Sequence, residues 1–224
     1  MRWKALFAVA LACTHGLGAQ AAKSVTPAKD AGVQVPGWVG RLDPAAERSG
    51  AKLSDAKFFP AGDDIHVAPG PPAIFWHPSN KGIGAYSVAA RFTQTKAPDR
   101  AEYYGLFIGG SRLDRPEQNY LYCVISGNGT FTVKHRNAGE VNELVGRTVN
   151  AAIRKANADG QATNEVAFRV TAARTSCLIN GTEVWGYASK DLVGPGKLVS
   201  TDGVAGIRVN HHLDIRIAGF ALGK

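Results

Sequence analysis

The chain has 224 residues, of which 45% are hydrophobic and 20% are charged, with a formal net charge of +8 at pH 7. Its length is enough to bury roughly 70% of the unfolded chain's surface in a single core. The basic residues are scattered rather than clustered, which excludes nucleic acid as a predicted partner. After the first residues no apolar stretch is long enough for a membrane span.

Residues 1–21 have the pattern of a secretory signal peptide. Arg2 and Lys4 form a basic start, residues 5–12 are an apolar run too short to span a bilayer, and Ala19-Gln20-Ala21 is a small-x-small cleavage site. We therefore predict export to the periplasm or the extracellular space. Lipidation at Cys13 is an alternative that ranks lower, because the apolar run before it is short.

Residues 22–57 are rich in Ala, Lys, Gly and Pro and have no strong apolar periodicity. Such a composition is typical of an N-terminal linker that is partly disordered, with some order near Trp38. The folded domain is predicted to cover residues 58–224.

After this segment, short β-branched and aromatic runs alternate with turn residues, a pattern typical of strands. Asn128-Gly129 and Asn180-Gly181 are predicted to turn hairpins, because both central positions of such turns need positive φ. Asn210-His211-His212 is predicted to turn the last pair. The predicted strands cover residues 65–67, 73–76, 85–95, 102–108, 119–126, 130–136, 164–172, 175–179, 183–187, 204–210 and 213–221. Many short strands predict an all-β, antiparallel two-sheet sandwich.

One segment, residues 148–159, has apolar residues at helix-like spacing and a glycine, Gly160, that could end a helix. Its apolar side chains are small, so the pattern predicts one or two helical turns on the surface. A loop is the alternative.

Asn128 and Asn180 each begin an Asn-Gly-Thr sequon. A hairpin turn accounts for all three residues, so glycosylation ranks below the turn interpretation. Cys123 and Cys177 both lie within predicted strands. In an exported protein the pair favours a disulfide over two buried thiols, and no histidine flanks either cysteine to support a catalytic thiol.

Three segments resemble a known family: YGLFIGGSRLDRPEQNYLYCVISGNGTFTVK (104–134), CLINGTEV (177–184) and TDGVAGIRVNHHLDIRIAGF (201–220). They are similar to secreted bacterial proteins with a concanavalin A-like, laminin-G-like jelly-roll domain, related to the group labelled 3-keto-disaccharide hydrolase. The resemblance covers about residues 60–221. It implies two curved sheets with a sugar site on the concave face or at a rim. It supplies no catalytic residues, since this fold hosts lectins, glucanases and adhesion modules.

A polar loop followed by aromatic residues is the predicted ligand site. Sugars are bound by planar hydrogen-bonding side chains beside an aromatic ring, and this segment has both. A solvated loop with internal ion pairs is the plainer alternative. The candidate residues are Arg112, Asp114, Arg115, Glu117, Asn119, Tyr120 and Tyr122, with Trp76, His77, His135 and Arg136 at other strand ends.

Patterns for catalysis and metal binding are weak. The sequence has no Glu-x-Asp-x-x-Glu string, as the jelly-roll glucanases have, and no nucleophile elbow. His211, His212 and Asp214 are weak candidates for a metal site if the chain turns there. No cofactor is predicted. Calcium is the alternative, but no loop dense in Asp and Asn indicates it.

The favoured function is an exported, non-catalytic domain that binds carbohydrate or another envelope or extracellular partner. A hydrolase or lyase acting on modified (3-keto) disaccharides is the second hypothesis, and a structural or adhesion module is the third. A concave pocket with two or more buried acids or histidines would favour the enzyme. A shallow groove with an exposed Tyr or Trp would favour binding, and a flat polar face would favour the third hypothesis.

Overall fold

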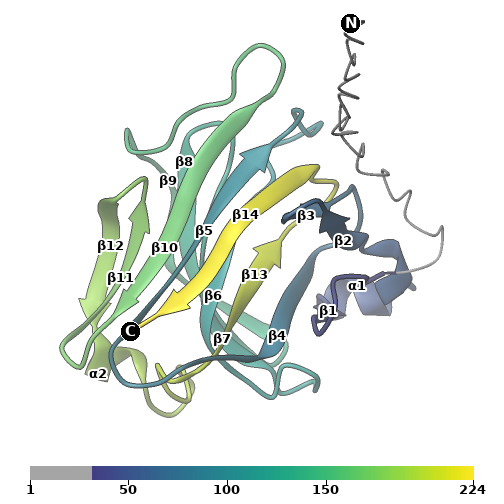
Figure 1. Cartoon of the computed structure of the whole chain (residues 1–224). Helices are drawn as coiled ribbons and strands as arrows, with labels where there is room; N and C mark the ends of the chain where they lie inside the picture. The colour runs from purple at the N-terminus through teal and green to yellow at the C-terminus, as the bar shows by residue number, and fades with distance from the viewer. Residues whose placement is uncertain (1–31) are drawn as a thin grey trace, which may run out of the picture.

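The structure is a computed structural model that describes residues 32–224. It consists of two antiparallel sheets of seven strands each, packed face to face (Figure 1). The predicted all-β jelly-roll sandwich is therefore confirmed. The predicted signal peptide and Cys13 lie outside the described residues.

The strands of each sheet come from distant parts of the chain, as in a jelly roll. The first sheet has the order β1 (Val39–Leu42), β4 (Ala73–Gly82), β13 (Gly203–Val209), β6 (Tyr104–Ser111), β7 (Asn119–Ile125), β8 (Thr130–Asn137), β9 (Glu140–Val149). The second sheet has the order β12 (Thr182–Ala188), β11 (Arg174–Ile179), β10 (Ala162–Val170), β5 (Tyr86–Gln94), β14 (Ile215–Gly223), β3 (Asp64–Val67), β2 (Phe58–Ala61). Strands β9 and β12 are thus edge strands.

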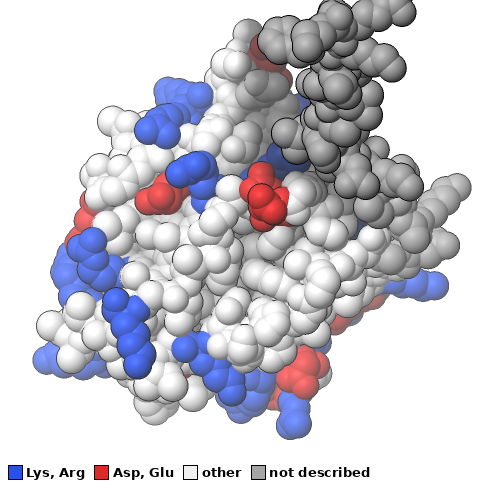
Figure 2. Space-filling model, viewed as in Figure 1, with Lys and Arg blue, Asp and Glu red and all other residues white. Residues whose placement is uncertain are grey.

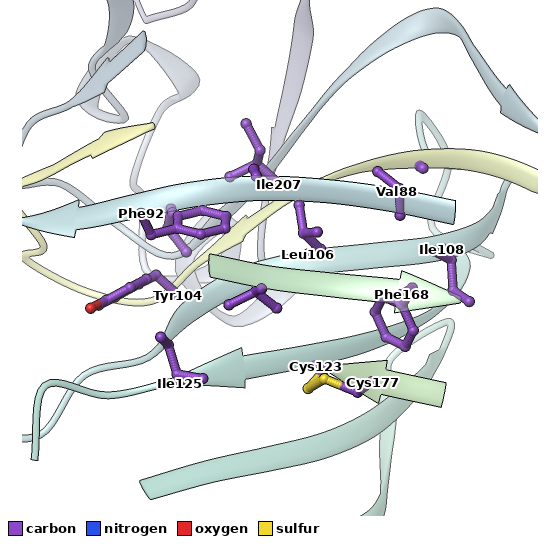
Figure 3. Close-up of a cluster of buried hydrophobic side chains, with 14 of the residues drawn as sticks. Val88, Phe92, Tyr104, Leu106, Ile108, Cys123, Ile125, Phe168, Cys177 and Ile207 are labelled. Carbon is purple, nitrogen blue, oxygen red and sulfur yellow. A yellow bond between two sulfur atoms is a disulfide. The ribbon is translucent and has the colours of Figure 1, made fainter. Parts of the chain in front are cut away.

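Alternating burial along the strands creates the core between the sheets. In β5 and β10 every second residue is buried, as the pleat requires when one face packs and the other meets solvent. Phe92 and Phe168 of the second sheet point toward Leu106 and Ile108 of the first (Figure 3). Burying each such side chain stabilises the fold by about 1.5–3 kcal/mol.

The predicted disulfide is present between Cys123 of β7 and Cys177 of β11, with Cα atoms 6.4 Å apart (Figure 3). These two strands belong to different sheets. The bond therefore joins the two layers of the sandwich within the core.

The N-terminal segment differs from the predicted linker. β1 pairs with β4, and a short helix, α1 (Pro44–Arg48), and a 3₁₀ turn (Leu53–Asp55) follow it. The ring of Trp38 lies 5.3 Å from that of Phe58 and 5.2 Å from that of Phe220. A few well-placed apolar residues are enough to dock this segment. Order was expected near Trp38, but it extends to the elements at residues 39–55, where a linker was predicted.

The helix predicted at residues 148–159 is also absent. Strand β9 continues to Val149, and the chain then turns, with the amide of Ile153 bonded to the carbonyl of Asn150. The small apolar residues fit a strand end and a turn as well as a helix. The second short helix, α2 (Ser189–Leu192), follows β12.

Among residues 32–224, no helix is long and apolar enough to cross a membrane.

The predicted turns form for different reasons. Asn180 and Gly181 have φ of 50° and 81°, which confirms the prediction for that hairpin. At Asn128-Gly129 only Gly129 has a positive φ, so the reason given for that turn is wrong. The turn at His212, with φ of 51°, leads from β13 in the first sheet to β14 in the second, so it does not close a hairpin.

Basic side chains are dispersed over the face shown in Figure 2, which looks onto the second sheet. They form several separate groups around a largely uncharged surface rather than one continuous patch. This arrangement agrees with the scatter of Lys and Arg in the sequence.

Candidate ligand-binding site

The loop after β6, which the sequence singles out, remains at the surface. Arg112, Asp114, Arg115 and Glu117 are exposed. Asn119 is buried, and its side-chain amide donates to the Lys197 carbonyl at 3.1 Å and accepts from the Val199 amide at 3.1 Å. Asn119 therefore fastens the loop around residues 197–199 to the first sheet.

The predicted aromatic residues gather on the face of the first sheet that points away from the core. Trp76, Tyr120 and Tyr122 are only 7%, 0% and 5% exposed. The ring of Tyr120 lies 5.2 Å from that of Phe107 and 5.6 Å from that of Tyr122. They form a second hydrophobic cluster, and their buried rings offer little surface to a ligand.

An aspartate from the N-terminal segment closes this face. Asp43 accepts two hydrogen bonds from the guanidinium of Arg208, at 2.5 and 2.7 Å. Arg136 lies 3.2 Å from the same carboxylate, and its Nε donates to the hydroxyl of Tyr120 at 3.1 Å. Burial opposes ionisation of Asp43, but the two guanidinium groups outweigh it, so the pKa of Asp43 lies below its ordinary value.

Among the other predicted histidines, His77 has a local partner, whereas His211 and His212 form no metal-binding group with Asp214. His77 bonds through Nδ1 to the hydroxyl of Ser79 at 2.6 Å. Asp214 does not pair with His211 or His212; instead its carboxylate contacts His66 at 2.8 Å and Thr95 at 2.6 Å. Within residues 32–224, no three His, Cys, Asp or Glu side chains are grouped so that they could hold a metal ion.

A cavity of about 310 Å³ lies at the end of the sandwich where the edge strands β9 and β12 face each other. Side chains from both sheets and from the segment after α2 surround it. The lining residues are Leu121, His135, Asn142, Leu144, Tyr187, Asp191, Leu192, Gly196, Lys197 and Leu198.

One aromatic ring of β12, that of Tyr187, lines this cavity, and the ring of Trp185 lies next to it. Trp185 pairs with Cys177 and Tyr187 pairs with Thr175, so both side chains point toward the interior side of the sheet. Their rings are 6.3 Å apart and parallel within 2°. Tyr187 lines the cavity and is 48% exposed, while Trp185 packs partly against the core. Tyr187 thus combines an accessible ring with a fixed orientation.

The polar groups of the cavity lie opposite this ring. His135 on β8 is 5% exposed, and its Nε2 has no hydrogen-bond partner among the described residues. Burial lowers the pKa of His135, so its imidazole is neutral near pH 7. Asn142 faces His135 across the β8–β9 pair, and the ammonium of Lys197 donates to the Asp191 carbonyl at 2.9 Å.

This arrangement suits a small polyhydroxy ligand. An accessible ring can pack against the C–H face of a sugar, while imidazole, amide and carboxylate groups bond its hydroxyls. Of the residues predicted from the sequence, only His135 lines this cavity. Its neighbour Arg136 does not, since successive side chains of β8 point to opposite faces of the sheet. The alternation of Trp185 and Tyr187 in a predicted strand is the signal that could have led to the site.

A second, more open groove of about 790 Å³ runs between α1 and the turns near residues 70 and 212. Small apolar residues and polar residues both line it; the polar ones are Asp43, Ser49, Ser54, Asp55, Lys57, His211 and His212. It has no Trp or Tyr ring among its lining residues, so the cavity between β9 and β12 is the stronger candidate for sugar binding.

The sequence matches no family model and no curated protein sequence. Solved structures share the fold at low identity. The chain is similar to carbohydrate-binding module CBM66 from Bacillus subtilis, with a TM-score of 0.57, 7% identity and coverage of 84% of this chain and 96% of the module. It is also similar to the metal-free carbohydrate recognition domain of Emp46p, with a TM-score of 0.54, 8% identity and coverage of 84% and 88%.

A third similar structure is a Bacillus subtilis protein of unknown function with a galectin-like fold. The TM-score is 0.56 at 14% identity, and the match covers 83% of this chain and 88% of that one. At these identities the likeness concerns the fold alone. The fold class is therefore a two-sheet jelly roll, and the relation to the 3-keto-disaccharide hydrolase group stays a prediction.

Proposed function

We propose that this chain is an exported, non-catalytic domain that binds carbohydrate in the cavity between β9 and β12. The observation that carries the proposal is the pair of parallel rings, Trp185 and Tyr187, beside a cavity lined by polar side chains. Two of the similar folds are described as a carbohydrate-binding module and a carbohydrate recognition domain, which supports the same class of ligand.

The size of the cavity favours a small ligand. Its volume of about 310 Å³ is at the lower end of the range for ligand pockets, about 300–1,000 Å³. A mono- or disaccharide unit fits this range better than a long polymer laid along the surface. The Cys123–Cys177 disulfide supports the export part of the proposal, because such bonds persist mainly in oxidising compartments.

A glycan array with the full chain tests the proposal, run with and without calcium. Any sugar that binds is then titrated against Tyr187→Ala and against Arg112→Ala. We expect Tyr187→Ala to weaken binding about 10-fold, which corresponds to the loss of one ring contact. Arg112→Ala, at another exposed position in the polar loop, should leave the affinity unchanged.

The opposite pattern, a loss in Arg112→Ala with Tyr187→Ala intact, would move the site to the loop at residues 112–119. Binding that needs calcium would show that a metal site contributes. Release of a cleaved product from the bound sugar would contradict the non-catalytic part and favour the hydrolase hypothesis. Absence of binding to every sugar would overturn the proposal.

A further inference from the structure

We infer that His135 determines the specificity of the cavity, by hydrogen-bonding through Nε2 to a hydroxyl group of a neutral sugar. The inference rests on the proposed function and adds the residue and the ligand class. It follows from the position of this side chain, from its unpaired nitrogen and from the charges around it.

His135 is part of the inner wall rather than of the rim. Its strand neighbours in register are Leu121 on β7 and Asn142 on β9, and both also line the cavity. Leu192 and Leu198 complete the apolar part of this wall. A ligand that enters past Tyr187 therefore reaches a surface on which His135 is the buried polar group.

The unpaired Nε2 is unusual for a side chain that is only 5% exposed. Buried polar atoms in folded proteins nearly always have a partner, because an unpaired one loses its hydration without compensation. A leucine at this position would fit the apolar wall without that penalty. A ligand hydroxyl in the cavity would supply the partner that the protein does not.

The charges at the cavity favour a neutral ligand. Asp191 and Lys197 are the charged residues that line it, and they are of opposite sign. The Lys197 ammonium already donates to the Asp191 carbonyl. Burial keeps the imidazole of His135 uncharged near neutral pH. The lining thus has no net charge, so a sugar carboxylate would lose hydration without meeting an excess of positive charge in exchange.

The test uses His135→Leu and His135→Gln, with the sugar found on the array and its uronic acid counterpart as probes. We expect His135→Leu to weaken binding of the neutral sugar about 10-fold, as the loss of one hydrogen bond in a buried site predicts. The same variant should melt about 2–4 °C higher, because the unpaired nitrogen is gone. His135→Gln places an amide near the position of Nε2 and should recover part of the affinity.

Failure of the inference and failure of the proposed function have different signatures. Normal binding by His135→Leu with weak binding by Tyr187→Ala would overturn the role of His135 and leave the site in place. Normal binding by both variants would remove the site as well. A lower melting temperature for both His135 variants would show a structural role for His135 instead. Tighter binding of the uronic acid than of the neutral sugar would overturn the ligand class.

Discussion

At the scale of single residues, Asp43 links the N-terminal segment to the outer face of the first sheet. It lies in the N-terminal segment, yet its carboxylate sits between two guanidinium groups on strands of the first sheet. The ring of Tyr122 lies 5.6 Å from the Arg208 guanidinium, so the ion pairs rest on the aromatic cluster. Removing the carboxylate would leave two buried positive charges without a counterion.

Asp43→Ala is therefore expected to lower the free energy of unfolding by about 3–5 kcal/mol, the usual cost of breaking a buried ion pair from one side. Urea unfolding followed by tryptophan fluorescence measures it. Glu47→Ala is the matched control, because the Arg41–Glu47 pair is partly exposed, at 3.4 Å. Such a pair contributes at most about 1 kcal/mol. Equal effects of the two substitutions would contradict the importance assigned to Asp43.

The lowered pKa of Asp43 adds a pH signature to the same experiment. A carboxyl group with a depressed folded-state pKa stabilises the protein above its unfolded value, here 3.8, and the contribution disappears as the pH falls toward the folded value. Asp214 contributes in the same direction, since bonds from Thr95 and His66 outweigh the effect of burial and lower its pKa. Asp43→Ala should thus reduce, but not abolish, the loss of stability below about pH 4.

Residue-level predictions from the sequence were limited by distance along the chain. Asp43 and Arg208 are 165 positions apart, and no local pattern connects them. The cysteine pair was predictable because only two cysteines remain after the predicted cleavage. His135 was identified as a candidate. Its neighbour Asn142 follows from the pairing of β8 with β9, but Tyr187 belongs to the other sheet and comes near only when the two sheets pack.

At the scale of elements, the β11–β12 hairpin positions the rings of the cavity. Asn180 occupies its turn with a positive φ and also joins it to other elements. Its side chain accepts from the Glu165 amide at 2.9 Å and donates to the Ala152 carbonyl and to the Asn164 side chain, both at 2.7 Å. The turn is thereby fixed to β10 and to the segment after β9.

Asn180→Ala should lower the free energy of unfolding by about 2–4 kcal/mol, because it adds strain at positive φ and removes three side-chain hydrogen bonds, two of them partly buried. Asn180→Gly separates these causes, since glycine tolerates the backbone conformation and should restore about 1 kcal/mol. Asn128→Ala, in a turn where Asn has no positive φ, should cost about 1 kcal/mol or less. Thermal unfolding of the three variants measures these differences in stability. If Asn180→Ala is as stable as Asn128→Ala, Asn180 does not fix the turn as described.

Elements with one buried face were predictable from sequence, and exposed edge strands were not. In β5 and β10 the apolar residues alternate as the pleat demands. Strand β9 has no buried residue, so its sequence has no such alternation and was assigned in part to a helix. Asn142 and Leu144 of β9 line the cavity. Since this strand was not recognised in the sequence, the cavity was missed, and the polar loop at residues 112–119 was chosen as the site instead.

At the scale of the whole molecule, the sandwich holds together by the packing of its two sheets, and the cavity lies where their edges separate. The spacing between β9 and β12 is therefore set by the interior contacts nearest to them. The Cys123–Cys177 bond is one such contact, since β11 is the neighbour of β12 and the bond ties it to β7.

Breaking this bond should affect stability more than fold. It closes a loop with a sequence separation of 54 residues, for which the chain-entropy model gives a stabilisation of about 4 kcal/mol. The double substitution Cys123→Ala/Cys177→Ala should lower the unfolding free energy by this order, measured in urea, and dithiothreitol should then have no further effect on it. Wild-type protein in dithiothreitol should approach the same value. Sugar affinity measured on the folded fraction should fall as well, because the two edges of the cavity are then free to separate. Unchanged stability on reduction would mean that interior packing alone holds the two sheets together. Unchanged sugar affinity would mean that the second sheet alone positions the ring of Tyr187.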